Sequence, residues 1–385
     1  MPAWRVDLLA TAPPEDLTSG LSRVVWTLAV GLARRGHRVR VLYPSQPYRT
    51  GPPYEGVERV PIPVVGLRRG PYAFERAVGR AAGELIDPRT DLVIANDEKG
   101  GAIEWPRRGR HPVFGYYAHD VQQHHLVTMR AATQPSPTAR QRLGTWLDRR
   151  TIARLESTAL ARAAVILIAS QQGLELLERY YHVDRSRVKV IPPAIPDLPE
   201  VGSREACREM LHIPLDVPVV SFLGRTPERQ GLPLALDAFR RVRAFFPGMR
   251  LLVAGCTPPV APGVMPFGVV DEPTKARLLR ASDVFLFPAR YEGFGLAPRE
   301  AMQAGVATIV SRHVPMDGAP VPGAVRVVPE DDAGAYASEL AALLAEPAAC
   351  RAMAEQGRRY AEQFRPERMA ERVEAAFAPF LPGGT

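Results

Sequence analysis

Two glutamates separated by seven residues stand in the segment with the strongest potential for chemistry. Glu292 and Glu300 belong to the run FPARYEGFGLAPREAM at residues 287–302. An apolar run leads into a glycine-rich loop and then into a predicted helix, in which Pro298 suits the first position. Amides of Phe294, Gly295 and Leu296 would be free at that helix start, where unpaired N–H groups and the helix dipole bind anions. The pattern predicts an anion site beside which Glu292, next to Gly293, can reach a sugar and Glu300 can hold hydroxyl groups.

A second loop repeats this layout upstream. Residues 221–231, SFLGRTPERQG, run from an apolar strand into a basic loop that contains glycine. Arg225 can neutralise a diphosphate with its planar, forked donors. Arg229 and Gln230 close the loop before the next predicted helix. The alternative for Arg225 is an ordinary surface arginine.

Two candidates lie in the first half of the chain. Gly20, within TSGLSR at residues 18–23, permits close backbone approach to a ligand. His119 and Asp120 follow the apolar run at 113–117, so they stand where a strand ends. A loop with a helix cap is the alternative for Gly20, and a purely structural histidine is the alternative for His119.

Strands and helices alternate twice along the chain. The first series holds apolar runs of strand length at 4–10, 39–43, 91–95, 113–117, 165–169 and 188–191, with helical spacing between them. A polar, proline-rich stretch follows near 190–205. The second series has strands at 219–223, 250–254, 283–287, 307–310 and 324–328. This alternation predicts an α/β protein of two doubly wound parallel-sheet domains, whose ligands bind beyond the carboxyl ends of the strands.

Charge is distributed unevenly between the two halves. Residues 1–195 carry 28 Arg or Lys against 18 Asp or Glu, whereas the remainder carries 21 against 23. A basic first half favours an anionic acceptor or a membrane surface, and a solvated basic surface is the alternative. The three cysteines are too few and too far apart for a disulfide framework or a metal knuckle. Without a signal-peptide layout or a spanning apolar run, we expect a cytoplasmic protein.

Taken together, these motifs resemble glycosyltransferase family 4, the retaining enzymes of GT-B fold. The Glu292 to Glu300 spacing within EGFGL matches the glutamate signature of that family. Further matching segments are the Gly20 loop, GHRV at 36–39, residues 91–97, His119, Ser170, the Arg225 loop and ASDVFLFP at 281–288.

The resemblance implies two Rossmann-like domains that face each other across a cleft. Residues 1–195 would form the acceptor-side domain and 196–365 the donor domain. The final segment, 366–385, would be a helix that crosses back to the first domain.

The resemblance also implies roles for the residues singled out above. Glu300 would bind the donor ribose, and Arg225 and the 294–296 backbone would hold the diphosphate. Glu292 and His119 would lie at the transferred sugar. The remaining positions are Gly20 at the diphosphate, with Gly268 and Val269 at the base.

No protein nucleophile, cofactor or metal is then expected, since attack occurs on the face that the diphosphate leaves. The donor would be a UDP- or GDP-linked sugar. The acceptor is open among a glycan, a lipid and a small molecule, with His124, His125 and the basic stretch 129–142 as candidate acceptor elements. A peripheral membrane contact through the basic first domain, at the inner face of the membrane, is a further expectation.

Two positions depart from the family pattern. Gln230 stands where a lysine that assists with the diphosphate is expected, and Pro193-Ala194 replaces an expected Asn-Gly. The alternatives are therefore a catalytically impaired partner protein that binds a nucleotide or glycan, and a hydrolase or epimerase of nucleotide sugars. The first loop lacks G-x-G-x-x-G, which disfavours a nicotinamide dehydrogenase. Dispersed basic residues without an aromatic platform disfavour nucleic-acid binding.

Overall fold

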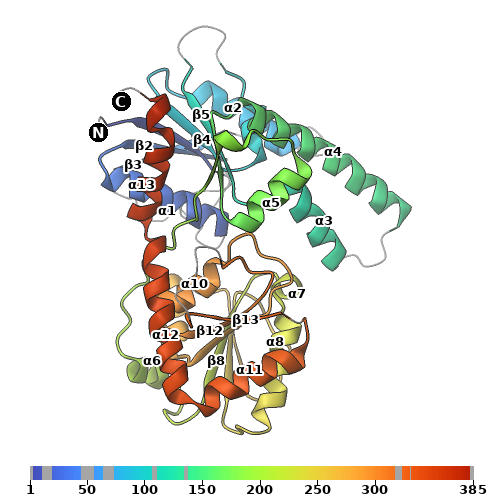
Figure 1. The fold of residues 1–385 in the computed structure, drawn as a ribbon, viewed down its shortest axis with the longest axis vertical. Coiled ribbons are helices and arrows are strands. Elements are labelled where there is room, and N and C mark those ends of the chain that lie inside the picture. The colour runs from blue at the N-terminus through green and yellow to red at the C-terminus, as the bar shows by residue number, and fades with distance from the viewer. Residues whose placement is uncertain are drawn as a thin grey trace. The chain divides into compact units, whose positions relative to one another are not determined.

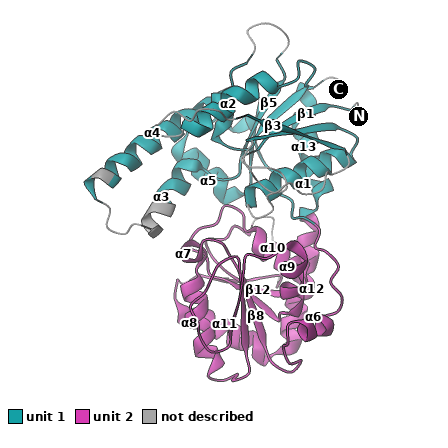
Figure 2. Cartoon of the chain, turned by 180° about the vertical axis from the view of Figure 1, so that it is seen from behind, with its two compact units in different colours: residues 1–196, 364–385 teal, residues 197–363 magenta. Residues whose placement is uncertain are grey.

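The computed structural model divides into two compact units (Figures 1 and 2). The structure describes residues 3–10, 20–44, 56–63, 73–105, 111–133, 138–316, 323–329 and 331–381. Unit 1 contains Met1–Pro196 and Phe364–Thr385, and unit 2 contains Asp197–Gln363. The chain thus leaves unit 1 after Pro196 and returns to it at Phe364.

Unit 1 is built on a sheet in which every described strand pair is parallel. The strand order is β3-β2-β1-β4-β5-β6-β7. The strands are β1 (Arg5–Leu9), β2 (Arg38–Pro44), β3 (Val57–Ile62), β4 (Leu92–Ala95), β5 (Val113–Ala118), β6 (Val165–Ile168) and β7 (Val188–Val190). The helices are α1 (Gly20–Arg34), α2 (Ala73–Leu85), α3 (Gln122–Thr133), α4 (Ala139–Arg162), α5 (Gln171–Tyr180) and α13 (Pro366–Phe377), with short 3-10 turns at Glu98–Ala102, Arg185–Arg187 and Ala378–Phe380.

Unit 2 repeats the parallel design. Its strand order is β10-β9-β8-β11-β12-β13. The strands are β8 (Val219–Leu223), β9 (Arg250–Ala254), β10 (Val264–Gly268), β11 (Val284–Phe287), β12 (Ala307–Ser311) and β13 (Arg326–Val328). The helices are α6 (Arg204–Met210), α7 (Pro227–Gln230), α8 (Leu232–Arg243), α9 (Glu272–Ala281), α10 (Leu296–Gln303), α11 (Ala333–Ala345) and α12 (Pro347–Ala361), and a 3-10 turn at Glu362–Phe364 follows. Two parallel-sheet α/β units confirm the predicted fold class.

The central strands of both units are buried along their length, because parallel sheets of this kind are covered by crossover helices. All five residues of β8 and all four of β11 are buried. In both sheets the strand order reverses beside the first strand, at β1/β4 in unit 1 and at β8/β11 in unit 2. Such a switch point opens a ligand crevice at the carboxyl ends of the strands.

The last helix, α13, packs against α1 of unit 1. A side chain at Gly31 of α1 would collide with the backbone of Pro366. Further along α13, the Phe377 ring lies against the backbone of Gly115 in β5 and is fully buried. Close backbone approach at two glycines fixes where the helix sits on unit 1.

Charged side chains secure the same helix. Glu374 accepts two hydrogen bonds from Arg35, each 2.6 Å, and lies 2.8 Å from His37 Nε2. The Nδ1 atom of His37 accepts from the Trp4 backbone amide at 3.1 Å. That bond leaves the ring proton on Nε2, so His37 donates to Glu374.

Candidate functional site

The predicted donor residues of unit 2 gather at one edge of its sheet. Arg225 follows β8, Val269 follows β10, and Glu292 lies in the loop after β11. Because these strands are parallel, their carboxyl ends meet at the same edge. The residues therefore lie where a ligand of a doubly wound sheet is expected.

The loop after β11 carries both glutamates of the motif. Gly295 adopts a left-handed backbone, with φ of 84°, and caps α10 at Leu296. Pro298 is thus the third helical residue and not the first, and Glu300 lies beyond the first turn. The first turn still tolerates the proline, since its amide would lack a helical partner there. The amides at the helix start are those of Leu296 and Ala297, whereas the sequence analysis named Phe294, Gly295 and Leu296.

Arg299 shapes this loop from within, a role that the sequence analysis missed. Its guanidinium is fully buried and donates to the carbonyls of Phe294, Gly295 and Pro315. The guanidinium carbon also lies 3.8 Å from the centroid of the Phe294 ring. One buried cation thereby fixes the backbone before α10 and the segment after β12.

Glu300 is paired with a lysine that the sequence analysis also missed. The Glu300 side chain is 1% exposed, and the Nζ atom of Lys275 on α9 lies 3.2 Å from its Oε2. The same Nζ lies 2.6 Å from Glu272 Oε2. A buried carboxylate is costly unless it is paired, and Lys275 supplies the opposite charge beside Glu300.

Glu292 lies beside Arg229. The Arg229 Nη1 atom is 3.5 Å from Glu292 Oε2, and both side chains are largely buried. Arg229 also donates to Thr226 Oγ1 at 3.2 Å and to the Tyr291 carbonyl at 3.1 Å. A guanidinium from the loop after β8 therefore stands next to the glutamate of the loop after β11.

The Gln230 side chain forms a hydrogen bond within its own loop. Its Oε1 atom accepts from the Thr226 amide at 3.0 Å. The following residue, Gly231, has φ of 80° and packs on the Pro288 carbonyl, where no side chain would fit. The two loops are further joined by the Arg290 amide, which donates to the Arg229 carbonyl at 2.8 Å. Arg225 lies exposed at the start of the same loop.

Gly268 ends β10 in a left-handed conformation, with φ of 62°. Its carbonyl accepts from the Gly255 amide at 2.6 Å. The next residue, Val269, is 63% exposed. Backbone groups of this turn thus lie at the same edge of the sheet as the two loops.

His119 and Gly20 belong to unit 1. Gly20 is the first residue of α1, and Thr18 and Ser19 of the predicted loop lie outside the described residues. His119 directly follows β5, and its ring lies tilted by 30° against that of Tyr117 at a centroid distance of 4.0 Å. Both positions lie after central strands of the unit 1 sheet, at its carboxyl edge.

The protonation state of His119 follows from its partners. Burial lowers the pKa of His119 to about 3, although the charge of Asp97 opposes this shift. The amide nitrogen of Asn96 donates to the Leu9 and Ile94 carbonyls, so its Oδ1 faces His119 Nε2 at 3.0 Å. The ring is therefore neutral with its proton on Nε2. Its Nδ1 is buried with no hydrogen-bond partner among the described residues, and it can accept from a ligand hydroxyl.

The described part of the candidate acceptor elements lies on two helices. His125 Nδ1 is 3.0 Å from Asp120 Oδ2, and His124 Nδ1 is 3.2 Å from the Tyr180 hydroxyl. α3 extends to Thr133, and α4 opens at Ala139 behind a capping box formed by Thr138 and Gln141. Residues 134–137, within the predicted stretch 129–142, lie outside the described residues.

Family models match both halves of the chain. The model of Glycosyltransferase Family 4 matches residues 18–197, and that of Glycosyl transferases group 1 matches residues 217–346. The chain is also 27% identical to the D-inositol 3-phosphate glycosyltransferase of Segniliparus rotundus, over 95% of this chain and 85% of that protein.

The chain belongs to glycosyltransferase family 4.

Solved structures share the fold of this glycosyltransferase. Sucrose-phosphate synthase from Thermosynechococcus elongatus matches with a TM-score of 0.76 at 20% identity, covering 98% of this chain and 99% of that one. The HepE protein of Anabaena, solved in complex with UDP and glucose, matches with a TM-score of 0.70 at 14% identity, covering 97% and 99%. These likenesses place the glycosyltransferase among proteins of GT-B fold.

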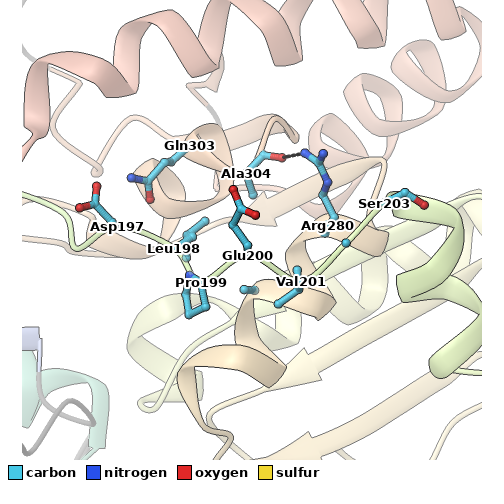
Figure 3. A pocket seen from close by; sticks show the side chains of 11 residues that line it. Asp197, Leu198, Pro199, Glu200, Val201, Ser203, Arg280, Gln303 and Ala304 are labelled. Carbon is cyan, nitrogen blue, oxygen red and sulfur yellow. Dashed lines mark hydrogen bonds between the residues drawn. The ribbon is translucent and has the colours of Figure 1, made fainter. Parts of the chain in front are cut away.

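A separate pocket of about 520 Å³ lies in unit 2 of the glycosyltransferase (Figure 3). The segment Asp197–Ser203 and residues of α9 and α10 line it, and Arg280 donates to the Ala304 carbonyl at 3.4 Å. None of the predicted donor residues lines this pocket. It therefore adds nothing to the donor site.

The described residues offer neither a metal cluster nor a membrane span. They contain no group of three or more His, Cys, Asp or Glu side chains placed to hold a metal ion. No helix formed by these residues is both long enough and apolar enough to cross a membrane.

Proposed function

We propose that this glycosyltransferase takes its sugar from a nucleoside-diphosphate sugar, UDP- or GDP-linked, and passes it to a hydroxyl acceptor with retention of configuration and without a metal. The observation that carries the proposal is the buried Glu300 carboxylate, paired with Lys275 next to the start of α10. A fixed carboxylate suits ribose hydroxyls, and helix-start amides suit phosphates.

The charges around this edge suit a departing diphosphate. Arg225, Arg229 and Lys275 bring three cations to the loops after β8 and β10. In the proposed step the bond from the anomeric carbon to the diphosphate oxygen breaks, and the acceptor oxygen bonds to the same face of that carbon. The acceptor proton passes to the leaving diphosphate. The protein contributes by stabilising the developing charge with donors that are already in position.

Glu292 and His119 would contact the transferred sugar. Glu292 can accept from sugar hydroxyls, with the Arg229 guanidinium beside it. The neutral His119 ring offers Nδ1 as a further acceptor. The acceptor substrate would lie toward α3, where His124 and His125 stand, and its class stays open among a glycan, a lipid and a small molecule. We further propose a cytoplasmic enzyme that meets the inner face of the membrane peripherally.

The donor is tested by incubating the enzyme with UDP-, GDP-, ADP- and TDP-sugars and measuring release of the nucleoside diphosphate. Glu300→Ala and Arg225→Ala should each weaken nucleotide binding in calorimetry by roughly tenfold to a hundredfold. Glu209→Ala, at an exposed position of α6, is the control and should bind normally. Unchanged affinity in both site variants would refute the site assignment.

Retention and metal independence need separate measurements. The anomeric configuration of the product, read by NMR, should match that of the donor. Turnover should persist after treatment with a chelator. A product of inverted configuration would contradict retention. A rate that falls on treatment with the chelator would contradict metal independence.

Gln230 favours a second candidate, a partner protein that binds a nucleotide or glycan without turnover. Its amide serves the Thr226 backbone and brings no charge to the diphosphate. Binding of a nucleoside diphosphate without turnover of any donor, in the presence of broad acceptor mixtures, would favour this candidate.

A further inference from the structure

Three large apolar side chains stand in solvent on the N-terminal half of α4. Leu143 is 58% exposed, Trp146 is 50% exposed and Leu147 is 42% exposed. With Arg150 they follow the spacing i, i+3, i+4, i+7, which places all four on one face of a helix. We name these four residues the α4 outer face.

The opposite side of α4 is the side that packs on unit 1. Ile152, Leu155, Glu156 and Ala159 are buried and repeat the same spacing. This buried stripe begins nine residues after Leu143, which is two and a half turns of helix, so the two stripes point in opposite directions. The orientation of α4 is therefore set by its core side, and the described residues of unit 1 leave the α4 outer face exposed.

Buried hydrogen bonds fix this orientation. The Glu156 carboxyl accepts from the Tyr181 hydroxyl at 2.5 Å, from the Tyr116 hydroxyl at 3.3 Å and from the Gln122 amide at 3.3 Å. In both views, the N-terminal half of α4 extends away from the sheet of unit 1 (Figures 1 and 2). The exposed stripe thus lies on a projecting helix whose other half is firmly held.

Arginines surround the exposed apolar stripe. Arg150 lies within it, its guanidinium carbon 4.6 Å from the centroid of the Trp146 ring. Arg142 and Arg149 are exposed on one flank of the stripe, and Arg154 is exposed one turn beyond Arg150 on the same face. The sole acidic residue in the exposed half of the helix, Asp148, is half-buried and points away from the stripe.

We propose that the α4 outer face docks on the surface of an anionic lipid bilayer. Tryptophan and leucine enter the boundary between headgroups and acyl chains, while arginines on the same helix pair with lipid phosphates. Long arginine side chains reach the headgroups even from within an apolar stripe. A second copy of this chain fits less well, because two such faces would set arginines against arginines. The inference concerns attachment alone and does not rest on the proposed donor chemistry.

The probe is a vesicle of phosphatidylcholine with about 30% phosphatidylglycerol, compared with pure phosphatidylcholine. The full-length protein should co-sediment with the anionic vesicles, and less so as salt rises. Trp146 reports the contact directly, since Trp4 is buried and Trp26 and Trp105 are half-buried. Its emission should shift to the blue on binding and become protected from acrylamide.

Two variants separate the apolar and the charged contributions. Leu143→Ser with Leu147→Ser, and Arg149→Gln with Arg150→Gln, should each lower partitioning to anionic vesicles by about tenfold or more. Their matched controls are Leu215→Ser and Arg358→Gln with Arg359→Gln, all exposed in unit 2, which should partition normally. Unchanged far-UV circular dichroism confirms that each variant is folded.

Three outcomes would overturn the proposal. The first is that the protein does not co-sediment with anionic vesicles. The second is binding that the α4 variants and the unit 2 controls reduce equally. The third is a concentration-dependent dimer in sedimentation that Trp146→Ala abolishes, because the α4 outer face would then be an interface between two copies of this chain.

Discussion

At the scale of single residues, Lys275 is the clearest addition to what the sequence motif suggested. Its ammonium stands 2.6 Å from Glu272 and 3.2 Å from Glu300. Lys275→Met removes this cation from beside a buried carboxylate, which should destabilise unit 2 by about 3 kcal/mol and weaken nucleotide binding. Denaturation followed by circular dichroism and calorimetry with UDP or GDP measure the two effects.

A double variant shows whether Lys275 acts through Glu300. Lys275→Met combined with Glu300→Gln should be less destabilised than the two single changes together, because the uncharged amide no longer needs the ammonium. Strict additivity would mean that the pair does not interact.

Arg229 is the second residue whose role the structure sharpens. Its guanidinium lies 3.5 Å from Glu292 and is held by Thr226 and Tyr291, whereas Gln230 serves the loop backbone. Arg229→Ala should therefore slow release of the nucleoside diphosphate by about a hundredfold, as expected for loss of a charge at the reacting centre. Gln230→Ala is the comparison and should cost less. If Gln230→Ala slowed the release more than Arg229→Ala, Gln230 would be the more important of the two residues at the diphosphate.

At the scale of elements, α13 contributes to unit 1 through one large side chain. The fully buried Phe377 ring fills the space that Gly115 leaves open in β5. Phe377→Ala should lower the unfolding free energy of unit 1 by about 3–5 kcal/mol, since a buried aromatic is lost and a cavity remains. Phe380→Ala, 52% exposed in the following turn, should have little effect. Urea denaturation followed by tryptophan fluorescence compares them.

Strongly apolar strands were readily predicted from the sequence, and edge strands were not. β8 and β11 are uninterrupted buried runs, whereas β3 at the sheet edge is buried only at its two ends, Val57 and Ile62. β10, the other omitted strand, contains Pro266, and its register with β9 shifts there. A proline and a half-exposed pattern are typical of edge strands, which carry little sequence signal.

In the donor loops, features set by neighbouring residues were predicted from the sequence, and features set by helix packing were not. The spacing of Glu292 and Glu300 and the glycines between them are local and visible in the sequence. The start of α10 was misplaced by two residues, because Pro298 fits several first-turn positions. Lys275 and Arg299 were missed because their partners depend on how α9 and α10 pack, although Lys275 is one of only three lysines in an arginine-rich chain.

At the scale of the whole molecule, the two units can be observed separately. All four tryptophans, Trp4, Trp26, Trp105 and Trp146, belong to unit 1. Tryptophan fluorescence therefore follows the unfolding of unit 1, while circular dichroism follows both units. Unit 1 also holds the buried acids with raised pKa values. Burial raises the pKa of Glu156 to about 8 and that of Glu98 to about 7.

The raised pKa of Glu156 makes the stability of unit 1 depend on pH in a defined direction. Between its ordinary value of 4.5 and about 8, the folded protein keeps a proton that the unfolded chain releases. The unfolding free energy should thus fall across this window as pH rises, by an amount on the order of a few kcal/mol. Glu156→Gln stays neutral at every pH, so its unfolding free energy should fall less between pH 5 and pH 9, about four decades of proton activity. Urea denaturation followed by tryptophan fluorescence at the two pH values measures this difference. Glu175→Gln, exposed on α5, should keep the wild-type slope. An equally steep fall in Glu156→Gln would mean that Glu156 is ionised in the folded protein throughout this window.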